Sequence, residues 1–394
     1  MAPLVRTINE LQPELLCFFA PEHSREVIEH RIQPSLTHMP RRWDWVVTSD
    51  QHDLFASQRA LTDHFLPLVD AWRIHPGELV VVLGDATASM VGAVMLAGMD
   101  RSSKLIQVVN RSESTSTDDT PTIQGNVWDE AAASGRRDAS LFFNRGEYEA
   151  AASLFRLCEG RVSGGKKPLY HAFATMAEAY ACWHRLQHRL AWDKLKTAVK
   201  GLEVAALWGG PPGTAALVTA MKAHVAFLER IVMDPSESKE GLVVDLLANA
   251  VRRLQIQHDA EGAMRVLLRG LEQASQYRLF KAHRIKSWDV AADALPARYR
   301  MAWENRFRDE RDGRLKLPFH AQYQWLEELG DDLGHRFAKQ SSALMPLLDA
   351  ADRAVLGHGN ETVKPERVQQ LREKVLAIVD IAESALPTFP HLAL

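Results

Sequence analysis

The feature that most constrains the fold of this chain is a change of sequence period near residue 128. Before this point, short apolar runs alternate with amphipathic stretches of helical spacing, and after it the pattern is helical to the end. Alternating strands and helices of these lengths are typical of an open α/β sheet of Rossmann type. We therefore predict an α/β N-terminal domain that is followed by an all-α region.

The elements expected in the N-terminal part are short. Strands are expected over residues 15–19, 45–48, 79–83 and 104–109, and helices over residues 24–32, 58–72 and 88–99. The run Val80–Leu83 has no polar alternation, which indicates a strand that is buried on both faces of a parallel sheet. An edge strand is expected over Ile123–Trp128, after a loop rich in Ser, Thr and Asp.

The helical region is predicted to consist of helical hairpins. Leu141–Leu157 and Leu247–Leu271 both have the pattern of a helix, a polar turn and a second helix, but no regular period repeats, so a solenoid is not expected. We predict three domains: residues 1–128, a helical hairpin insert over residues 129–240, and a helical domain over residues 241–394.

The composition excludes several classes of protein. The chain is 46% hydrophobic and 25% charged with a net charge of −3, which argues against a protein whose whole surface is basic and binds duplex DNA. The three cysteines are too few and too scattered for a disulfide framework or a zinc site, and they suit a reducing compartment. No apolar run approaches the ~20 residues of a membrane span, and the start lacks a secretory hydrophobic region. We expect a soluble cytoplasmic protein without a membrane partner.

The segment from Arg353 to His358 is the first candidate site. Arginine can neutralise a developing phosphorane, and imidazole can move a proton near neutral pH. On an unbroken helix, positions five apart differ by about 140°, so the pair converges only if the helix ends near Leu356. Gly357 and Gly359 favour such an end, because glycine commonly occupies the left-handed turn that closes a helix. The alternative is a C-terminal cap of cationic residues favoured by the helix dipole, which is the commoner use of such residues.

The second candidate site is the turn that follows the third expected strand. In open α/β sheets, ligands bind at the carboxyl ends of strands. Backbone N–H groups at the helix start, with the Thr87 and Ser89 hydroxyls, are suited to an anionic or nucleotide ligand, and Gly84, Asp85 and Met90 complete the candidate set. The alternative is ordinary capping by Asp85 or Thr87, and both interpretations remain open. A dinucleotide cofactor is not expected, because the turn lacks the G-x-G-x-x-G fingerprint.

Other chemistry-bearing residues favour structural interpretations. His184 and His188 stand four apart, as in some metal sites, but no third ligand follows, so we expect histidines on a helix surface and no metal site. The tryptophans of the helical region are expected in the core: Trp183, Trp192, Trp208, Trp288, Trp303 and Trp325.

Five segments distributed along nearly the whole chain are similar to one known family. Val80–Met99 is similar to that family's strand, ligand-cradling turn and small-residue helix, and Leu141–Ala151 looks like its first helical hairpin. Asp245–Gln276 and Leu315–Phe337 resemble its later helices. Leu348–Gly359 falls where an arginine is expected four to six residues before a histidine. On these segments the chain resembles the CARF–HEPN proteins of type III CRISPR systems, in particular the subfamily with a helical insert.

The resemblance implies a function in antiviral defence. It implies a homodimer whose Rossmann-like CARF domains bind cyclic oligoadenylate as an allosteric activator. It also implies a composite HEPN site that cleaves an RNA substrate without a metal or other cofactor. The substrate 2′-hydroxyl would attack the adjacent phosphate, with His358 in proton transfer or positioning and Arg353 stabilising charge. Dependence on the 2′-hydroxyl would make the enzyme specific for RNA.

Departures from the family pattern keep a second hypothesis open. The subfamily's arginine lies seven residues before the histidine, where this chain has Ala351, and Asp352 replaces an asparagine. Ala88 replaces the lysine of the ligand turn, and the CARF opening strand has no counterpart before the helix expected at Leu4–Leu11. The second hypothesis is a catalytically degenerate CARF–HEPN binding or regulatory protein. An Arg353 that faces solvent would favour it, whereas convergence of Arg353 and His358 from two chains would favour the nuclease.

Overall fold

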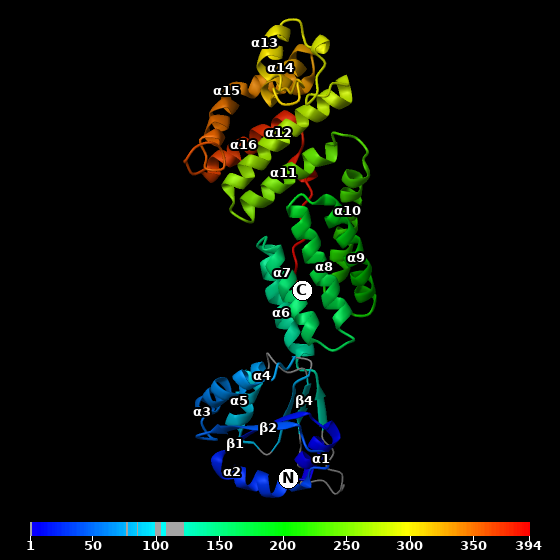
Figure 1. Cartoon of the computed structure of the whole chain (residues 1–394). Coiled ribbons are helices and arrows are strands. Elements are labelled where there is room, and N and C mark those ends of the chain that lie inside the picture. The colour runs from blue at the N-terminus through cyan, green and yellow to red at the C-terminus, as the bar shows by residue number, and fades with distance from the viewer. Residues whose placement is uncertain (1, 76–77, 85, 99–103, 108–121) are drawn as a thin grey trace. The chain divides into compact units, whose positions relative to one another are not determined.

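The structure is a computed structural model that describes residues 2–75, 78–84, 86–98, 104–107 and 122–394. The chain divides into two compact units (Figure 1). The first unit comprises residues 1–138 and 153–171, and the second comprises residues 139–152 and 172–394. The three predicted domain boundaries remain predictions.

The first unit contains strands and short helices in alternation. The strands are β1 (Leu15–Pro21), β2 (Arg42–Thr48), β3 (Val80–Leu83), β4 (Lys104–Gln107) and β5 (Thr122–Gly125). The helices are α1 (Ala2–Leu11), α2 (Glu22–Val27), α3 (Leu54–Ala60), α4 (Leu66–Ala71) and α5 (Ala88–Gly98), with π-helical segments η1 (Ile28–Ile32) and η3 (Leu61–Phe65) and a 3-10 turn η2 (Gln33–Ser35). The α/β character expected of this part of the chain is confirmed.

The strands do not join into one open sheet among the residues that the structure describes. β1 pairs in parallel with β2, β3 pairs in parallel with β4, and β4 pairs antiparallel with β5, so two separate sheets result. Each contains the parallel pairing that βαβ connections produce. All four residues of β3 are only half-buried, so the prediction of a strand covered on both faces is wrong. The four consecutive apolar residues of β3 therefore do not indicate complete burial.

Helices cover both faces of the β1–β2 pair, because alternate side chains of a strand point to opposite faces. On one face, Val46 packs against Leu61 of η3 and Ala93 of α5. On the other, Phe18 packs against Ile8 of α1 and Ile32 of η1. The β1–β2 pair is therefore the middle of three layers, helix, sheet and helix. This arrangement is compatible with a CARF domain.

From residue 128 onward the structure is helical, as the sequence predicts. The helices are α6 (Trp128–Asn144), α7 (Tyr148–Arg161), α8 (Lys167–His184), α9 (His188–Leu207), α10 (Thr214–Met233), α11 (Glu240–Gln255), α12 (Ala260–His283), α13 (Arg300–Phe307), α14 (Phe319–Glu328), α15 (Asp332–Asp352) and α16 (Pro365–Val379), with 3-10 turns η4 (Ala292–Ala294) and η5 (Glu383–Ala385). The two predicted hairpins are formed by α6 with α7 and by α11 with α12.

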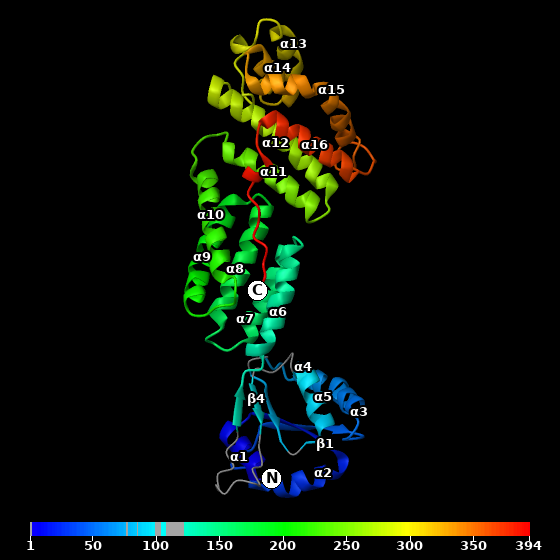
Figure 2. The ribbon, with the colours of Figure 1, turned by 180° about the vertical axis from the view of Figure 1, so that it is seen from behind.

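Helix α12 lies at the centre of the C-terminal helices, beside α11, α15 and α16 (Figures 1 and 2). Its Leu267 and Leu271 pack in one core with Leu344 of α15 and with Leu371 and Val375 of α16, and none of these side chains is more than 1% exposed. Burial of such side chains contributes about 1.5–3 kcal/mol each relative to exposure. The core therefore fixes α12 and α15 against each other.

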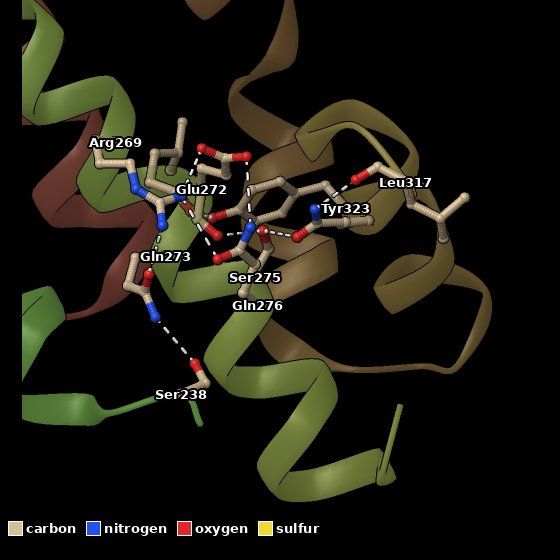
Figure 3. Close-up of polar contacts among 10 residues, drawn as sticks. Ser238, Arg269, Glu272, Gln273, Ser275, Gln276, Leu317 and Tyr323 are labelled. Carbon is tan, nitrogen blue, oxygen red and sulfur yellow. Dashed lines mark hydrogen bonds and ion pairs between the residues drawn. The ribbon is translucent and has the colours of Figure 1, made fainter. Parts of the chain in front are cut away.

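Two sets of hydrogen bonds involve buried polar side chains of α12 (Figure 3). Gln273 donates to Ser238 at 3.0 Å, and Ser275 donates to Gln322 of α14 at 2.7 Å. Gln322 in turn donates to the carbonyl of Leu317 at 2.7 Å. Buried polar groups destabilise a core unless they are hydrogen-bonded, and these polar side chains have partners.

The tryptophan predictions divide. Trp183, Trp303 and Trp325 are buried, as expected, at 0%, 6% and 3% exposure. Trp208 is 84% exposed, so the prediction of a core residue is wrong there. Trp208 is the C-cap of α9 and stands beyond the last helical turn, where no helix covers it.

Candidate functional site

The turn after α15 carries the first pair of predicted site residues. The helix ends at Asp352, with Arg353 as its C-cap, and not near Leu356 as the sequence predicts. The His358 N–H then donates to the Asp352 carbonyl at 2.8 Å, and the Gly357 N–H donates to the Ala354 carbonyl at 2.8 Å. The backbone of His358 therefore folds back beside the residue that precedes Arg353. The helix break brings both residues into one turn.

Glycine is required at two positions of this turn because a side chain would not fit, and not because the backbone is left-handed there. Neither Gly357 nor Gly359 has a positive φ, so the predicted left-handed glycine closure is wrong. A Cβ added to Gly357 would overlap the guanidinium of Arg265 and the Ala351 carbonyl oxygen. A Cβ added to Gly359 would overlap the carbonyl of Arg353. The chain passes too close to other backbone and side-chain atoms for any larger residue.

The two side chains have different surroundings. Arg353 Nε donates to Glu361 Oε1 at 3.1 Å, and both side chains are more than half exposed. The backbones of these residues are joined as well, because the Glu361 N–H donates to the Arg353 carbonyl at 2.9 Å. His358 is exposed, and its imidazole has no partner in the described part of the chain. The His358 imidazole is available to a ligand, whereas Arg353 would first have to leave the Glu361 carboxylate in order to bind one.

Two residues of α12 contact this turn, and sequence reasoning missed both. Arg265 Nη2 donates to the Ala351 carbonyl at 2.7 Å, and the Glu261 carboxylate accepts a hydrogen bond from the Leu356 N–H. They lie 86 and 95 residues from their partners. No motif spacing could have connected residues so far apart in sequence, and only the packing of α12 against α15 does so.

A second histidine lies near the same turn. His320 is half-buried at the start of α14. Burial lowers the pKa of His320, and the nearby Asp352 carboxylate partly offsets this effect. The neutral imidazole is therefore favoured at His320.

The second candidate site has the geometry of a helix cap. Thr87 Oγ1 donates to the Gln51 carbonyl and accepts the Met90 N–H at 3.3 Å, so Thr87 caps α5 as the structural alternative predicts. Ser89 Oγ donates to the His52 carbonyl at 2.7 Å. Met90 is 4% exposed, so its side chain belongs to the core and does not face a ligand.

The same contacts join the loops that follow two strands of different sheets. The Gln51–His52 turn follows β2, and the turn that contains Gly84 follows β3, so hydroxyls from the second turn join the loops after both strands. In α/β folds, ligands bind at loops of this kind, which follow the carboxyl ends of strands. Gly84 is half-buried there, and Asp85 lies outside the described residues.

His184 and His188 are not surface histidines, so that prediction is wrong. They lie on different helices, because α8 ends at His184 and α9 begins at His188. His184 is 7% exposed, and His188 Nε2 lies 2.7 Å from Oδ2 of the buried Asp245. Within residues that the structure describes, no group of three or more His, Cys, Asp or Glu side chains is arranged to hold a metal ion.

Among the described residues, none of the helices combines the length and the apolar character needed to cross a bilayer.

Two family models match the helical region of the chain. The Csm6 6H domain matches residues 132–228, and the Csm6 HEPN domain matches residues 236–382. The second match contains Arg353, His358, Arg265 and Glu261. Together the two matches cover more than half of the chain. No curated protein matches it.

A solved structure is similar over the whole chain. It is Enterococcus italicus Csm6 bound to cyclic hexa-2′-fluoro-hexa-dAMP, which matches with a TM-score of 0.58 at 9% sequence identity. The match covers 98% of this chain and 92% of the other. At this identity the likeness concerns the fold. With the 6H and HEPN matches in sequence and this likeness in fold, the chain belongs to the CARF–HEPN proteins of type III CRISPR systems.

Proposed function

We propose that this protein is a CRISPR-associated antiviral effector, an endoribonuclease that cyclic oligoadenylate activates and that needs no metal. The observation that supports the proposal best is the turn after α15. Within the stretch that matches the Csm6 HEPN domain, this turn holds an exposed histidine and an exposed arginine on adjoining backbone. A homodimer would place two such turns together and complete one site.

The proposed reaction is an internal transfer at the RNA phosphate. The substrate 2′-oxygen loses its proton and forms a bond to phosphorus, while the bond between phosphorus and the 5′-oxygen breaks and that oxygen gains a proton. His358 moves or positions a proton in this exchange. Arg353 stabilises the charge on the phosphoryl oxygens after it leaves Glu361. Separation of Arg353 from Glu361 costs little free energy, because an exposed ion pair contributes only about 0–1 kcal/mol.

The first test is RNA cleavage in the presence of EDTA, with and without cyclic tetra- and hexa-adenylate. We expect cleavage that depends on the activator and persists in EDTA, and that spares a substrate with 2′-deoxy sugars. His358→Ala is expected to lower kcat by roughly 10²–10⁴-fold. His335→Ala, an exposed histidine on α15, the helix that precedes the turn, is the matched control and should retain activity. Cleavage that survives His358→Ala would refute the assignment.

We propose that the activator binds where the loops after β2 and β3 meet. Backbone N–H groups and the hydroxyls of Thr87 and Ser89 would face its phosphates, after exchange of their present carbonyl partners. Thr87→Val should weaken binding of the cyclic oligoadenylate in calorimetry by about tenfold, the loss of roughly one hydrogen bond. Thr62→Val is the control, because the Thr62 hydroxyl on η3 donates to the Gln58 carbonyl one turn earlier, in α3.

A second candidate function is a catalytically degenerate binding or regulatory protein. The observation that favours it is the Arg353–Glu361 ion pair, which leaves the arginine half exposed and already neutralised in the single chain. This hypothesis predicts tight binding of cyclic oligoadenylate without any cleavage of RNA. Equal activity of the unmodified protein and His358→Ala, at a level no higher than without protein, would favour it over the nuclease.

A further inference from the structure

The turn from Arg353 to His358 has little apolar anchorage of its own. Ala354 is buried at 1% exposure, whereas Val355 and Leu356 are 57% and 62% exposed. The side chains of Arg353 and His358 are exposed as well. Because hydrophobic burial holds only one residue of this segment, its position depends on polar contacts.

Two charged residues of α12 supply polar contacts on both sides of the segment. Arg265 binds the Ala351 carbonyl, two residues before Arg353, and Glu261 binds the Leu356 N–H, two residues before His358. Glu261 and Arg265 stand four apart, so they project from the same face of the helix. We define this pair as the α12 clamp.

We propose that the α12 clamp positions His358, with Glu261 and Arg265 acting as positioning residues of the site. The inference rests on the proposed ribonuclease function and names residues on which that reaction depends. Each contact is charge-assisted and therefore stronger than a neutral hydrogen bond. A displacement of about 1 Å at a reacting group can lower a rate by roughly 10²-fold, so loss of the clamp would affect catalysis.

The fit between Arg265 and the turn is specific. The guanidinium and the Ala351 carbonyl oxygen lie so close to Gly357 that no side chain fits at that position, and the guanidinium donates to the same Ala351 carbonyl. Lysine offers a compact ammonium without the planar fork of arginine, so it cannot fill the same space and reach the same oxygen. The helix that carries Glu261 and Arg265 is held in place, because Ala263 and Leu267 on α12 are buried in the core.

The clamp is tested with graded variants in the full-length protein. The variants are Arg265→Met, Arg265→Lys, Glu261→Ala and Glu261→Gln, and Gln keeps an acceptor oxygen for the Leu356 N–H. The control is Arg269→Gln, one turn along α12, where the arginine binds Glu272 and Gln273 and does not hold the turn. The measurements are kcat and KM for RNA cleavage and hydrogen exchange of the Leu356 amide.

We expect Arg265→Met and Glu261→Ala to lower kcat by roughly 10–100-fold with little change in KM, because positioning is lost and RNA binding is kept. The Leu356 amide should exchange faster in both. Glu261→Gln should recover most of the rate, Arg265→Lys only a small part, and Arg269→Gln should behave as the unmodified protein. These differences must appear at unchanged melting temperature, which separates positioning from folding.

The outcome distinguishes the clamp from the nuclease proposal. If the unmodified protein cleaves RNA and the clamp variants keep its kcat, the clamp inference is wrong. If neither the unmodified protein nor any variant cleaves RNA, but amide exchange at Leu356 accelerates in Arg265→Met and Glu261→Ala, the clamp exists and the nuclease proposal fails. Unchanged exchange and unchanged rates together overturn the inference completely.

Discussion

Two groups of arginine, histidine and carboxylate residues in the helical region have opposite surroundings. Around Asp245, which is 0% exposed, Arg252, His188 and Trp183 donate at 3.3, 2.7 and 2.8 Å. At the turn after α15, the ion pair of Arg353 is exposed and the imidazole of His358 has no partner among described residues. The same residue types are therefore buried and paired with one another in one place, and exposed in the other.

The difference separates stability from function. A buried charge without its partner is strongly destabilising, so each member of the Asp245 group is constrained by the others. An exposed pair contributes little, so the Arg353 group is free to rearrange when a phosphate arrives. A titratable residue type is therefore a poor guide to function, and the burial of its partners is a better one.

The largest predicted effect is on the buried group. Asp245→Ala should lower the free energy of unfolding by about 3–5 kcal/mol, because Arg252 remains buried without its carboxylate. Burial lowers the pKa of Arg252, and the Asp245 carboxylate raises it again, which shows how far the pair depends on both charges. Denaturant unfolding measures the change. His358→Ala is the control and should leave the midpoint unchanged, and equal effects of the two variants would contradict the comparison.

The second prediction concerns pH. Burial lowers the pKa of His184 and of His224 to about 4, so both are neutral in the folded protein. Since their unfolded pKa is near 6.5, the unfolded state binds more protons between these values, and stability is lost as pH falls from 6.5 towards 4. At pH 5 each histidine should lower stability by about 2 kcal/mol.

Denaturant unfolding at pH 7.5 and pH 5 measures this loss. Replacing His224 with Gln should remove its share of the pH dependence. Phe389→Leu, which removes no titratable group, is the control and should keep the full pH dependence. A flat stability profile across this range would contradict the buried, neutral state.

The third prediction concerns the C-terminal segment, which runs back beside the helices of the second unit (Figures 1 and 2). The ring centroid of Phe389 lies 4.1 Å from Cζ of Arg252, and the ring packs against Trp183 and Tyr180. The Asn144 side chain forms hydrogen bonds with the backbone N–H and carbonyl of Leu392. Phe389→Ala should therefore lower stability by about 2–3 kcal/mol, somewhat less than for a fully buried ring. The melting temperature measures this, with Phe389→Leu as the milder comparison. An unaffected melting temperature would show that the segment does not support the buried group.

The smallest predicted effect belongs to the exposed group. Glu361→Gln removes the carboxylate that competes with phosphate for Arg353, and it should lower the KM for RNA by at most about fivefold, the equivalent of an exposed ion pair. Stability should not change measurably. A large loss of activity would instead mean that Glu361 takes part in the reaction.

Sequence reasoning located the helical turn of the site but not its supports. The R-x-x-x-x-H spacing with two glycines predicted a helix end near Leu356, and the structure has a helix end four residues earlier, at Asp352. Arg265 and Glu261 carried no local signal, because their partners, at the end of α15 and in the turn after it, are distant in sequence.

The sequence by itself determined the order of an α/β part and an all-helical part, because the hydrophobic period is a local property of the chain. It also placed the hairpins and the segment that matches a HEPN domain. Only the tertiary structure decided which polar residues are buried. His188 was predicted to lie on a helix surface, but it pairs with the buried Asp245, and His184 is itself buried. Met90 was predicted to contact a ligand, but its side chain is buried in the core. Burial and pairing depend on residues that are distant in sequence, so no local pattern contains them.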